Sequence, residues 1–194
     1  HAGENLAQVI QRRDRSLPPP LVMSDALRAN HLPDEDQILI RSYCLAHGGR
    51  QFSDIDAVFP DECQRVLSDL ARIYEHDRHC AQQSMSGSER LTYHQKHSGP
   101  ILERLKSWLE EQFSDRLVEP NSSLGKAYHY LLSRWEGFTR FLSVIDAPLD
   151  NNITERALKF MIRQRKNSLF LATEHSARVA SLLTSLIATA IEAG

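Results

Sequence analysis

Residues 47–148 carry helical periodicity without a convincing strand, and this long run most limits what the chain can fold into. Its apolar residues recur at spacings of three and four, as in Val66, Leu70 and Ile73, which is the period of an amphipathic helix. Ser86 with Glu89 forms a predicted capping box, and Asn121 or Ser122 is expected to cap a later helix. These helices must bury their apolar faces against each other.

The segments on either side of this run differ from it. Residues 4–13 predict a helix that the prolines of "SLPPP" end, and "LVMSDAL" and "ILIRSYC" predict two short strands. Pro148 ends the helical run, and further helices are expected from about residue 151 and over 176–192. We therefore predict a mostly helical α/β fold with three parts: a helix and two strands in 1–46, a helical insertion in 47–148, and a return to the first part in 149–194.

Composition narrows the functional class only slightly. The 194 residues have a net charge of −2, so any nucleic-acid binding must come from a local patch. The three cysteines show no paired spacing, which suits a reducing, cytoplasmic compartment. No apolar run approaches the roughly 18 residues of a membrane span, and no signal peptide is expected. Because the chain starts at His1 within a helical pattern, we interpret it as a piece of a longer protein.

Two carboxylates are the candidate catalytic groups. Glu155 lies on the same predicted helix face as Leu158 and Ile162, although it also suits a capping box with Asn152 as the N-cap. Asp25 follows the first predicted strand, where it could cap the next turn or belong to a site at the carboxyl end of the sheet. Two carboxylates meeting there could hold Mg²⁺, which prefers oxygen ligands, for phosphoryl transfer.

A basic stripe accompanies Glu155 in the sequence. It comprises Arg156, Lys159, Arg163 and Lys166, with Arg165 beside it, at spacings that place side chains on one side of a helix. A solvated charged face is the ordinary interpretation. Cations next to a metal-binding carboxylate also suit a phosphodiester backbone, and Asn167 is a further polar candidate.

Histidines and cysteines leave a zinc site open as a weaker option. Cys44 and His47, with "HDRHC" at residues 76–80, match the usual zinc-ligand spacing only loosely. A zinc-stabilised helical adaptor is the corresponding function. His94 and His97 are expected to be exposed or capping groups on a polar helix.

Several motifs resemble one known family. "PLDNNITERALKFMIRQRKNSLF", "CLAHGGRQF" and "LVMSDALRAN" are similar, in order and spacing, to segments of the insertion-sequence sixty-six family of bacterial transposases. "MSGSERLTYHQKHSGP" and "EPNSSLGKAYHYLLSRWE" also match, so the resemblance covers essentially the whole chain.

The resemblance implies an RNase H-like fold in which two aspartates and one glutamate hold two Mg²⁺ or Mn²⁺ ions for DNA cleavage and joining. Asp25 matches the second aspartate and Glu155 the glutamate, while the strand bearing the first aspartate is expected to precede this chain. The fold would then be partial, with a large helical insertion between its last strand and the glutamate-bearing helix.

The resemblance further implies DNA as partner and a homo-oligomer in the full-length protein. Arg50 is a candidate DNA contact, and Gly49 stands where the family commonly has a basic residue. A fragment without its first aspartate would be inactive alone. The alternative is a non-catalytic helical module, a remnant that binds DNA or a protein partner.

Overall fold

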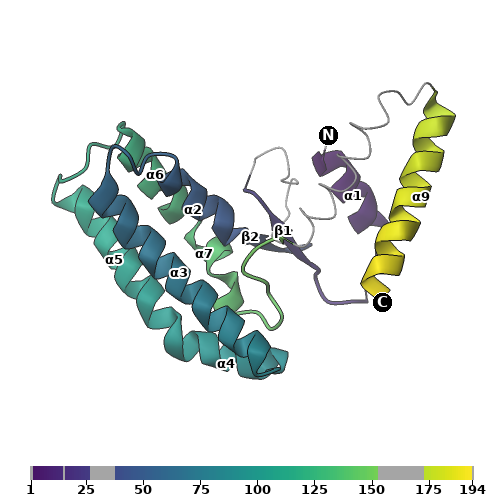
Figure 1. The fold of residues 1–194 in the computed structure, drawn as a ribbon, viewed down its shortest axis with the longest axis horizontal. Helices are drawn as coiled ribbons and strands as arrows, with labels where there is room; N and C mark the ends of the chain where they lie inside the picture. The colour runs from purple at the N-terminus through teal and green to yellow at the C-terminus, as the bar shows by residue number, and fades with distance from the viewer. Residues whose placement is uncertain (1, 15, 27–37, 153–172, 194) are drawn as a thin grey trace. The chain divides into compact units, whose positions relative to one another are not determined.

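The computed structural model describes residues 2–14, 16–26, 38–152 and 173–193. The chain divides into two compact units, 1–150 and 151–194, and each is considered by itself. Figure 1 shows the order of the elements, which are α1 (Ala2–Arg12), β1 (Leu21–Ser24), β2 (Ile40–Tyr43), α2 (Leu45–Ser53), α3 (Pro60–Gln82), α4 (Gly87–His97), α5 (Gly99–Ser114), α6 (Ser123–Leu132), α7 (Trp135–Phe138), η3 (Arg140–Leu142) and α9 (Glu174–Ala193).

The two strands pair in parallel. Leu21 lies opposite Ile40 and Ser24 opposite Tyr43, so both strands end at the same edge. Both predicted strands are confirmed, although each is shorter than its apolar run. Beyond β2 the chain enters α2 at Leu45, two residues earlier than the predicted start of the helical run.

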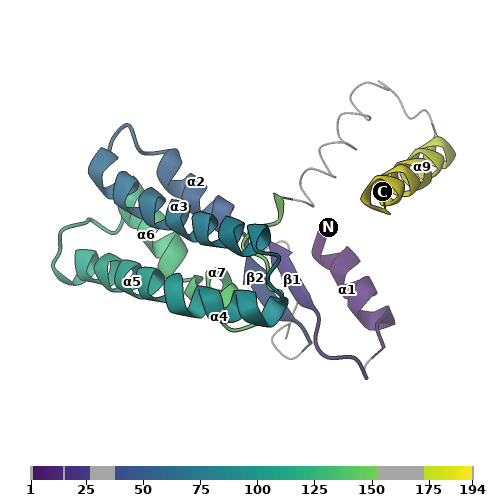
Figure 2. The same cartoon turned by 60° about the horizontal axis from the view of Figure 1, so that its bottom comes forward.

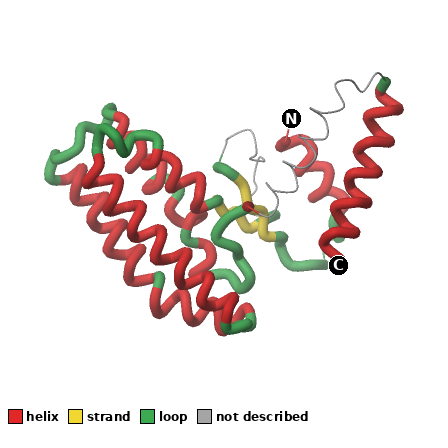
Figure 3. Tube along the Cα trace, in the orientation of Figure 1, coloured by secondary structure: helices red, strands yellow, loops and turns green. Residues whose placement is uncertain are grey.

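The helices of the first unit pack against one another in layers. The long helix α3 contacts α2, α4 and α5, and α6 contacts both α2 and α5. Figure 2 shows α2 and α3 side by side, with α4 and α5 forming the opposite layer. The tube in Figure 3 shows that strand content in the described chain is confined to the β1–β2 pair. The expected mostly helical α/β class is therefore confirmed.

Local sequence signals place the helix ends. Pro60 opens α3, where its missing N–H costs no helical hydrogen bond. The predicted capping box of α4 is present: the Glu89 N–H donates to Ser86 Oγ at 3.4 Å, and the Ser86 N–H donates to Glu89 Oε2 at 2.8 Å. Of the two candidate caps for α6, Ser122 is the one used, since its hydroxyl accepts from the Gly125 N–H at 3.0 Å.

An aromatic cluster lies at the centre of the helical layers. Tyr128 is fully buried, its ring centroid 6.0 Å from that of Phe52 and 5.5 Å from that of Trp108. The Tyr128 hydroxyl is buried without a hydrogen-bond partner among the described residues. Arg65 covers the outer face of Trp108, with its guanidinium carbon 4.3 Å from the ring centroid.

The helix expected after Ser122 is not continuous. It divides into α6, α7 and η3, partly because the Ser133 hydroxyl donates to the His129 carbonyl at 2.6 Å and such back-bonding favours a helix end or bend. Close packing fixes α7: a Cβ at Gly137 would overlap the ring of Tyr43 on β2. Only glycine therefore lets α7 approach the strand this closely.

The second unit is described through α9. Thr173 and Ser176 cap its start, because the Ser176 N–H donates to Thr173 Oγ1 and the Thr173 N–H to Ser176 Oγ, both at 3.1 Å. The predicted C-terminal helix is thus confirmed, beginning slightly earlier than expected. The helix expected from about residue 151 falls mostly on 153–172, outside the described residues. None of the described helices combines the length and hydropathy that a membrane span requires.

Candidate functional site

Asp25 directly follows β1 at the carboxyl end of the parallel pair, as predicted. The edge is closed beside it by the Cys44 N–H, which donates to the Ser24 carbonyl at 2.9 Å. Asp25 is half-buried, and the next residue, Ala26, is buried with a φ of 61°. That left-handed conformation costs a non-glycine residue about 1 kcal/mol or more. The backbone is therefore strained at Ala26, immediately after the candidate carboxylate.

Tyr130 of α6 ties the helical layers to Asp25. Its hydroxyl donates to the Asp25 carbonyl at 3.1 Å. Burial raises the pKa of the Tyr130 phenol; the Arg134 guanidinium opposes this rise, and the Asp25 carboxylate adds to it. The carboxylate of Asp25 is therefore within electrostatic reach of this phenol.

The chain returns to the same edge after the helices. The Leu45 N–H, one residue beyond Cys44, donates to the Leu149 carbonyl at 2.9 Å. This brings Asp150 close to the phenol of Tyr74, whose pKa is raised by burial first and then by the Asp150 carboxylate. Sequence reasoning gave Asp150 no role, although an acid just after the Pro148 that ends the helical run was a usable signal.

The other predicted site residues are distributed differently. Arg50 is exposed on α2, while position 49 faces α3, with a Cβ there 3.4 Å from Leu70. The side chain of a basic residue at position 49 would therefore start in contact with α3 rather than in solvent. Outside the described residues lie Glu155 and the proposed DNA contacts Arg156, Lys159, Arg163, Arg165, Lys166 and Asn167.

Within the described ranges, no three His, Cys, Asp or Glu side chains are grouped so that they could hold a metal ion. This covers the Cys44–His47 and 76–80 segments considered for zinc. All three cysteines are buried thiols, and burial raises the pKa of Cys63 and Cys80. Asp25 supplies hard oxygen ligands of the kind Mg²⁺ prefers, and a complete set would need residues beyond the described part.

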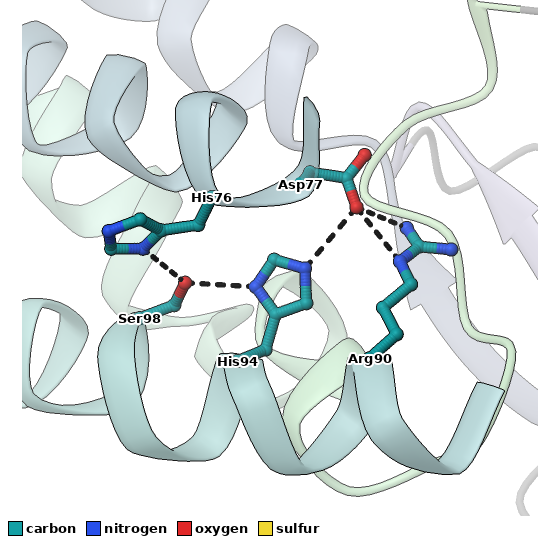
Figure 4. A network of polar contacts seen from close by, with 5 residues as sticks. All are labelled: His76, Asp77, Arg90, His94 and Ser98. Atoms are coloured by element: carbon teal, nitrogen blue, oxygen red, sulfur yellow. Dashed lines mark hydrogen bonds and ion pairs between the residues drawn. The ribbon is translucent and has the colours of Figure 1, made fainter. Parts of the chain in front are cut away.

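A Ser–His–Asp arrangement that the sequence did not indicate joins α3 to the junction of α4 and α5. The Ser98 hydroxyl lies 2.9 Å from His94 Nδ1, and His94 Nε2 lies 3.2 Å from Asp77 Oδ1. Arg90 pairs with the same Asp77 oxygen at 2.6 Å (Figure 4). His94 is only 1% exposed, so its expected exposure is wrong, whereas His97 is exposed as expected.

This arrangement is a structural tie. Ser98 is fully buried and also lies 3.0 Å from His76 Nδ1, so no substrate carbonyl can reach its hydroxyl. Burial raises the pKa of Asp77, but hydrogen bonding by His94 and the charge of Arg90 outweigh this and hold it below its ordinary value. The Asp77 carboxylate therefore stays ionised, and paired with Arg90, at neutral pH.

The architecture defines a class of protein: a mostly helical chain with a parallel strand pair and a single strand-end carboxylate in its described part. The family model described as "Transposase IS66 family" matches residues 8–179. The chain belongs to this family of transposases.

Curated relatives agree with the family match. The chain is 33% identical to "Uncharacterized protein y4jD" of Sinorhizobium fredii over 150 residues, and 29% identical to "Uncharacterized protein y4hP" of the same organism over 161 residues. These alignments cover 77% and 76% of this chain but only 29% and 28% of the two relatives. No solved structure matches the chain.

Proposed function

We propose that this chain is part of the catalytic region of a transposase that cuts and joins DNA strands with divalent metal ions. Family membership supplies the reaction class. The position of Asp25 at the carboxyl end of the parallel strands supports its assignment as a metal-holding carboxylate, because ligands in α/β sheets gather at that end.

The observation that carries the proposal is the return of the chain to the Asp25 edge. The Leu45–Leu149 hydrogen bond brings residue 149 back beside the strand ends, and Glu155 follows Asp150 by five residues. Five residues span at most about 18 Å. This return supports the proposal that Asp25 and Glu155, which are 130 positions apart in sequence, serve one site.

The RNase H-like fold also belongs to this proposal. It is supported by the succession of a helix, a strand that Asp25 directly follows, a parallel strand and a long helical segment. The missing first aspartate would come from sequence outside this chain, and the helical segment 47–148 would be an insertion. DNA and further copies of the full-length protein are the proposed partners.

Asp25 and Glu155 would hold Mg²⁺ or Mn²⁺, with two ions in the complete enzyme. Bound metal would supply charge stabilisation for an attacking and a leaving oxygen. The protein's part is to fix Asp25: Tyr130 holds its backbone carbonyl, and Ala26, with its left-handed backbone, follows directly after it. The cations from Arg156 to Lys166, with Asn167 and Arg50, are proposed to contact DNA phosphates.

The test uses a full-length transposase that carries this chain as its own segment. Asp25→Asn and Glu155→Gln should each lower Mg²⁺-dependent cleavage of transposon-end DNA by about 100-fold or more while DNA binding remains. Glu103→Gln, which removes an exposed carboxylate on α5, should leave cleavage unchanged.

Full cleavage by either carboxylate variant would remove that residue from the site. Inactivity of the wild-type full-length protein, with DNA binding intact, would favour the non-catalytic module. The isolated chain is expected to show no strand transfer.

A further inference from the structure

A cationic hollow lies on the first unit between β2, α5 and the α6–η3 segment. It encloses about 380 Å³ and is lined by Arg41, Lys106, Arg134 and Arg140, with Trp135 beside them. Among the described residues that line it, Glu136 is the single acid. A chain with a net charge of −2 thus gathers four cations around one cavity.

The guanidinium groups of the hollow are held in place by the fold. Arg41 lies on β2 and is only 6% exposed. Arg140 Nε donates to the Arg41 carbonyl at 3.0 Å. The guanidinium carbon of Arg134 lies 4.5 Å from the Tyr130 ring centroid, and its NH1 lies 3.0 Å from Ser133 Oγ.

These contacts leave donors for a ligand. Arginine has five N–H donors in a planar fork. Among the described residues, Arg140 donates through Nε to the Arg41 carbonyl, and Arg134 donates through NH1 to the Tyr130 carbonyl and the Ser133 hydroxyl. Lys106 forms one loose ion pair within the described chain, 3.8 Å from Glu110, and its side chain is 44% exposed. Pre-placed arginines lose little freedom on binding and match the geometry of a phosphate.

The hollow is also connected to the candidate carboxylate. Tyr130 donates to the Asp25 carbonyl through its hydroxyl and carries Arg134 against its ring. One side chain therefore bridges Asp25 and the lining of the hollow. A nucleic-acid strand running past Asp25 would pass the hollow within a few nucleotides.

We propose that this hollow binds a phosphate group of the DNA strand next to the phosphate acted on at Asp25, with Trp135 offering a ring on which an unpaired base can stack. The choice of DNA as ligand rests on the proposed function. A free nucleotide would offer the same phosphate chemistry, so the test includes it separately.

The test measures binding of fluorescent 20-nucleotide single-stranded and duplex DNA to the whole chain, in EDTA, over a salt series. Lys106→Glu should weaken binding about tenfold or more and lower the slope of log affinity against log salt by about 0.7 on single strands and 0.9 on duplex. Arg104→Glu is the matched control, an equal charge change two residues away at an exposed position outside the hollow. It should leave the slope unchanged.

Two further variants are expected to change DNA affinity in opposite directions. Glu136→Gln should tighten DNA binding several-fold, since it removes the acid from the lining. Trp135→Ala should weaken single-stranded binding about tenfold and duplex binding less. Thermal melting by circular dichroism checks that each variant is folded, and the Lys106 side chain, 44% exposed, is a position where substitution should leave the core intact.

Equal losses for Lys106→Glu and Arg104→Glu would overturn the proposal, as would binding of dATP or inorganic phosphate at this site without DNA binding. Since no metal is present and Asp25 is unchanged, the outcome is independent of cleavage. Loss of cleavage in Asp25→Asn would not affect the proposal for the hollow. Failure of the hollow variants to change DNA binding would not affect the assignment of Asp25.

Discussion

The hydroxyl of Tyr130 donates to the backbone carbonyl of Asp25 at 3.1 Å across 105 positions of sequence. Through this bond, a helix of the central helical layers holds the strand end that bears the candidate metal-binding carboxylate. This hydrogen bond makes the helical layers part of the structure that positions Asp25 in the candidate site.

Replacing Tyr130 with phenylalanine should therefore affect the site more than the fold. Loss of one hydrogen bond costs about 1 kcal/mol of stability. We expect cleavage by the full-length protein to fall a few-fold and its Mg²⁺ requirement to rise, because Asp25 is less firmly placed. Tyr93→Phe, on α4 away from Asp25, is the control. Equal Mg²⁺ titrations for the two variants would contradict this role of Tyr130.

Gly137→Ala should destabilise the first unit by about 1–3 kcal/mol, because the added methyl overlaps the Tyr43 ring. Gly99→Ala is the comparison, since a Cβ there would lie 3.9 Å from the His94 carbonyl oxygen, an ordinary contact distance, and helical alanine is favoured over glycine. Urea unfolding should separate the two variants. Equal stability of both would show that α7 is not tightly seated on β2.

Tyr128→Phe should leave the protein as stable as before or slightly more stable. Its buried hydroxyl has no partner among the described residues, and removing an unsatisfied polar group relieves a desolvation penalty of about 1–3 kcal/mol. Tyr128→Ala, which also removes the ring, should cost about 3–5 kcal/mol. A clear loss of stability in the phenylalanine variant would mean that the hydroxyl is satisfied.

The Asp77 pair predicts a loss of stability in acid. The pKa of Asp77 is held below its ordinary value of 3.8, so the folded state binds this proton less readily than the unfolded state. Its stabilising effect is fully present above pH 3.8 and is lost as pH falls through the lowered pKa. Asp77→Asn should cost about 1–3 kcal/mol at pH 7, and the difference from wild type should shrink in acid. A difference that stays constant with pH would contradict the ion pair.

His76 predicts a second pH dependence in a higher window. Burial lowers its pKa below 6.5, and His97, His94 and Arg72 act in the same direction while Glu75 opposes them. As pH falls below 6.5, the unfolded state takes up the proton first, so stability decreases until the lowered folded pKa is reached. His76→Gln should weaken this decrease between pH 7 and 5 in urea unfolding. An unchanged pH profile would show that other groups cause it.

The sequence predicted those parts of the fold whose causes are local. The caps at Ser86 and Ser122 and the opening Pro60 act within one turn of helix, and the parallel strands carried apolar runs. The break after Leu132 was missed because helical periodicity records neither the bond from the Ser133 hydroxyl to the His129 carbonyl nor the close approach of Gly137 to Tyr43.

The candidate site residues also differ in how far the sequence alone could predict them. Asp25 was predictable because a strand end is visible in the chain itself. The cationic hollow was not, since Arg41, Lys106, Arg134 and Arg140 come from three segments that are far apart in sequence. The placement of Glu155 relative to Asp25 stays a prediction, because Glu155 lies outside the described residues.

The hydrogen bond from Leu45 to Leu149 joins the two ends of the segment 46–148. Besides these two ends, Tyr130, Gly137 and Arg140 of the enclosed segment hydrogen-bond to residues of the strands or of their ends. Closure entropy grows only with the logarithm of loop length, so the parts of the enclosed segment that do not touch the strands could change in length while the strand edge keeps its shape. Relatives are accordingly expected to differ most in size between these two anchor points.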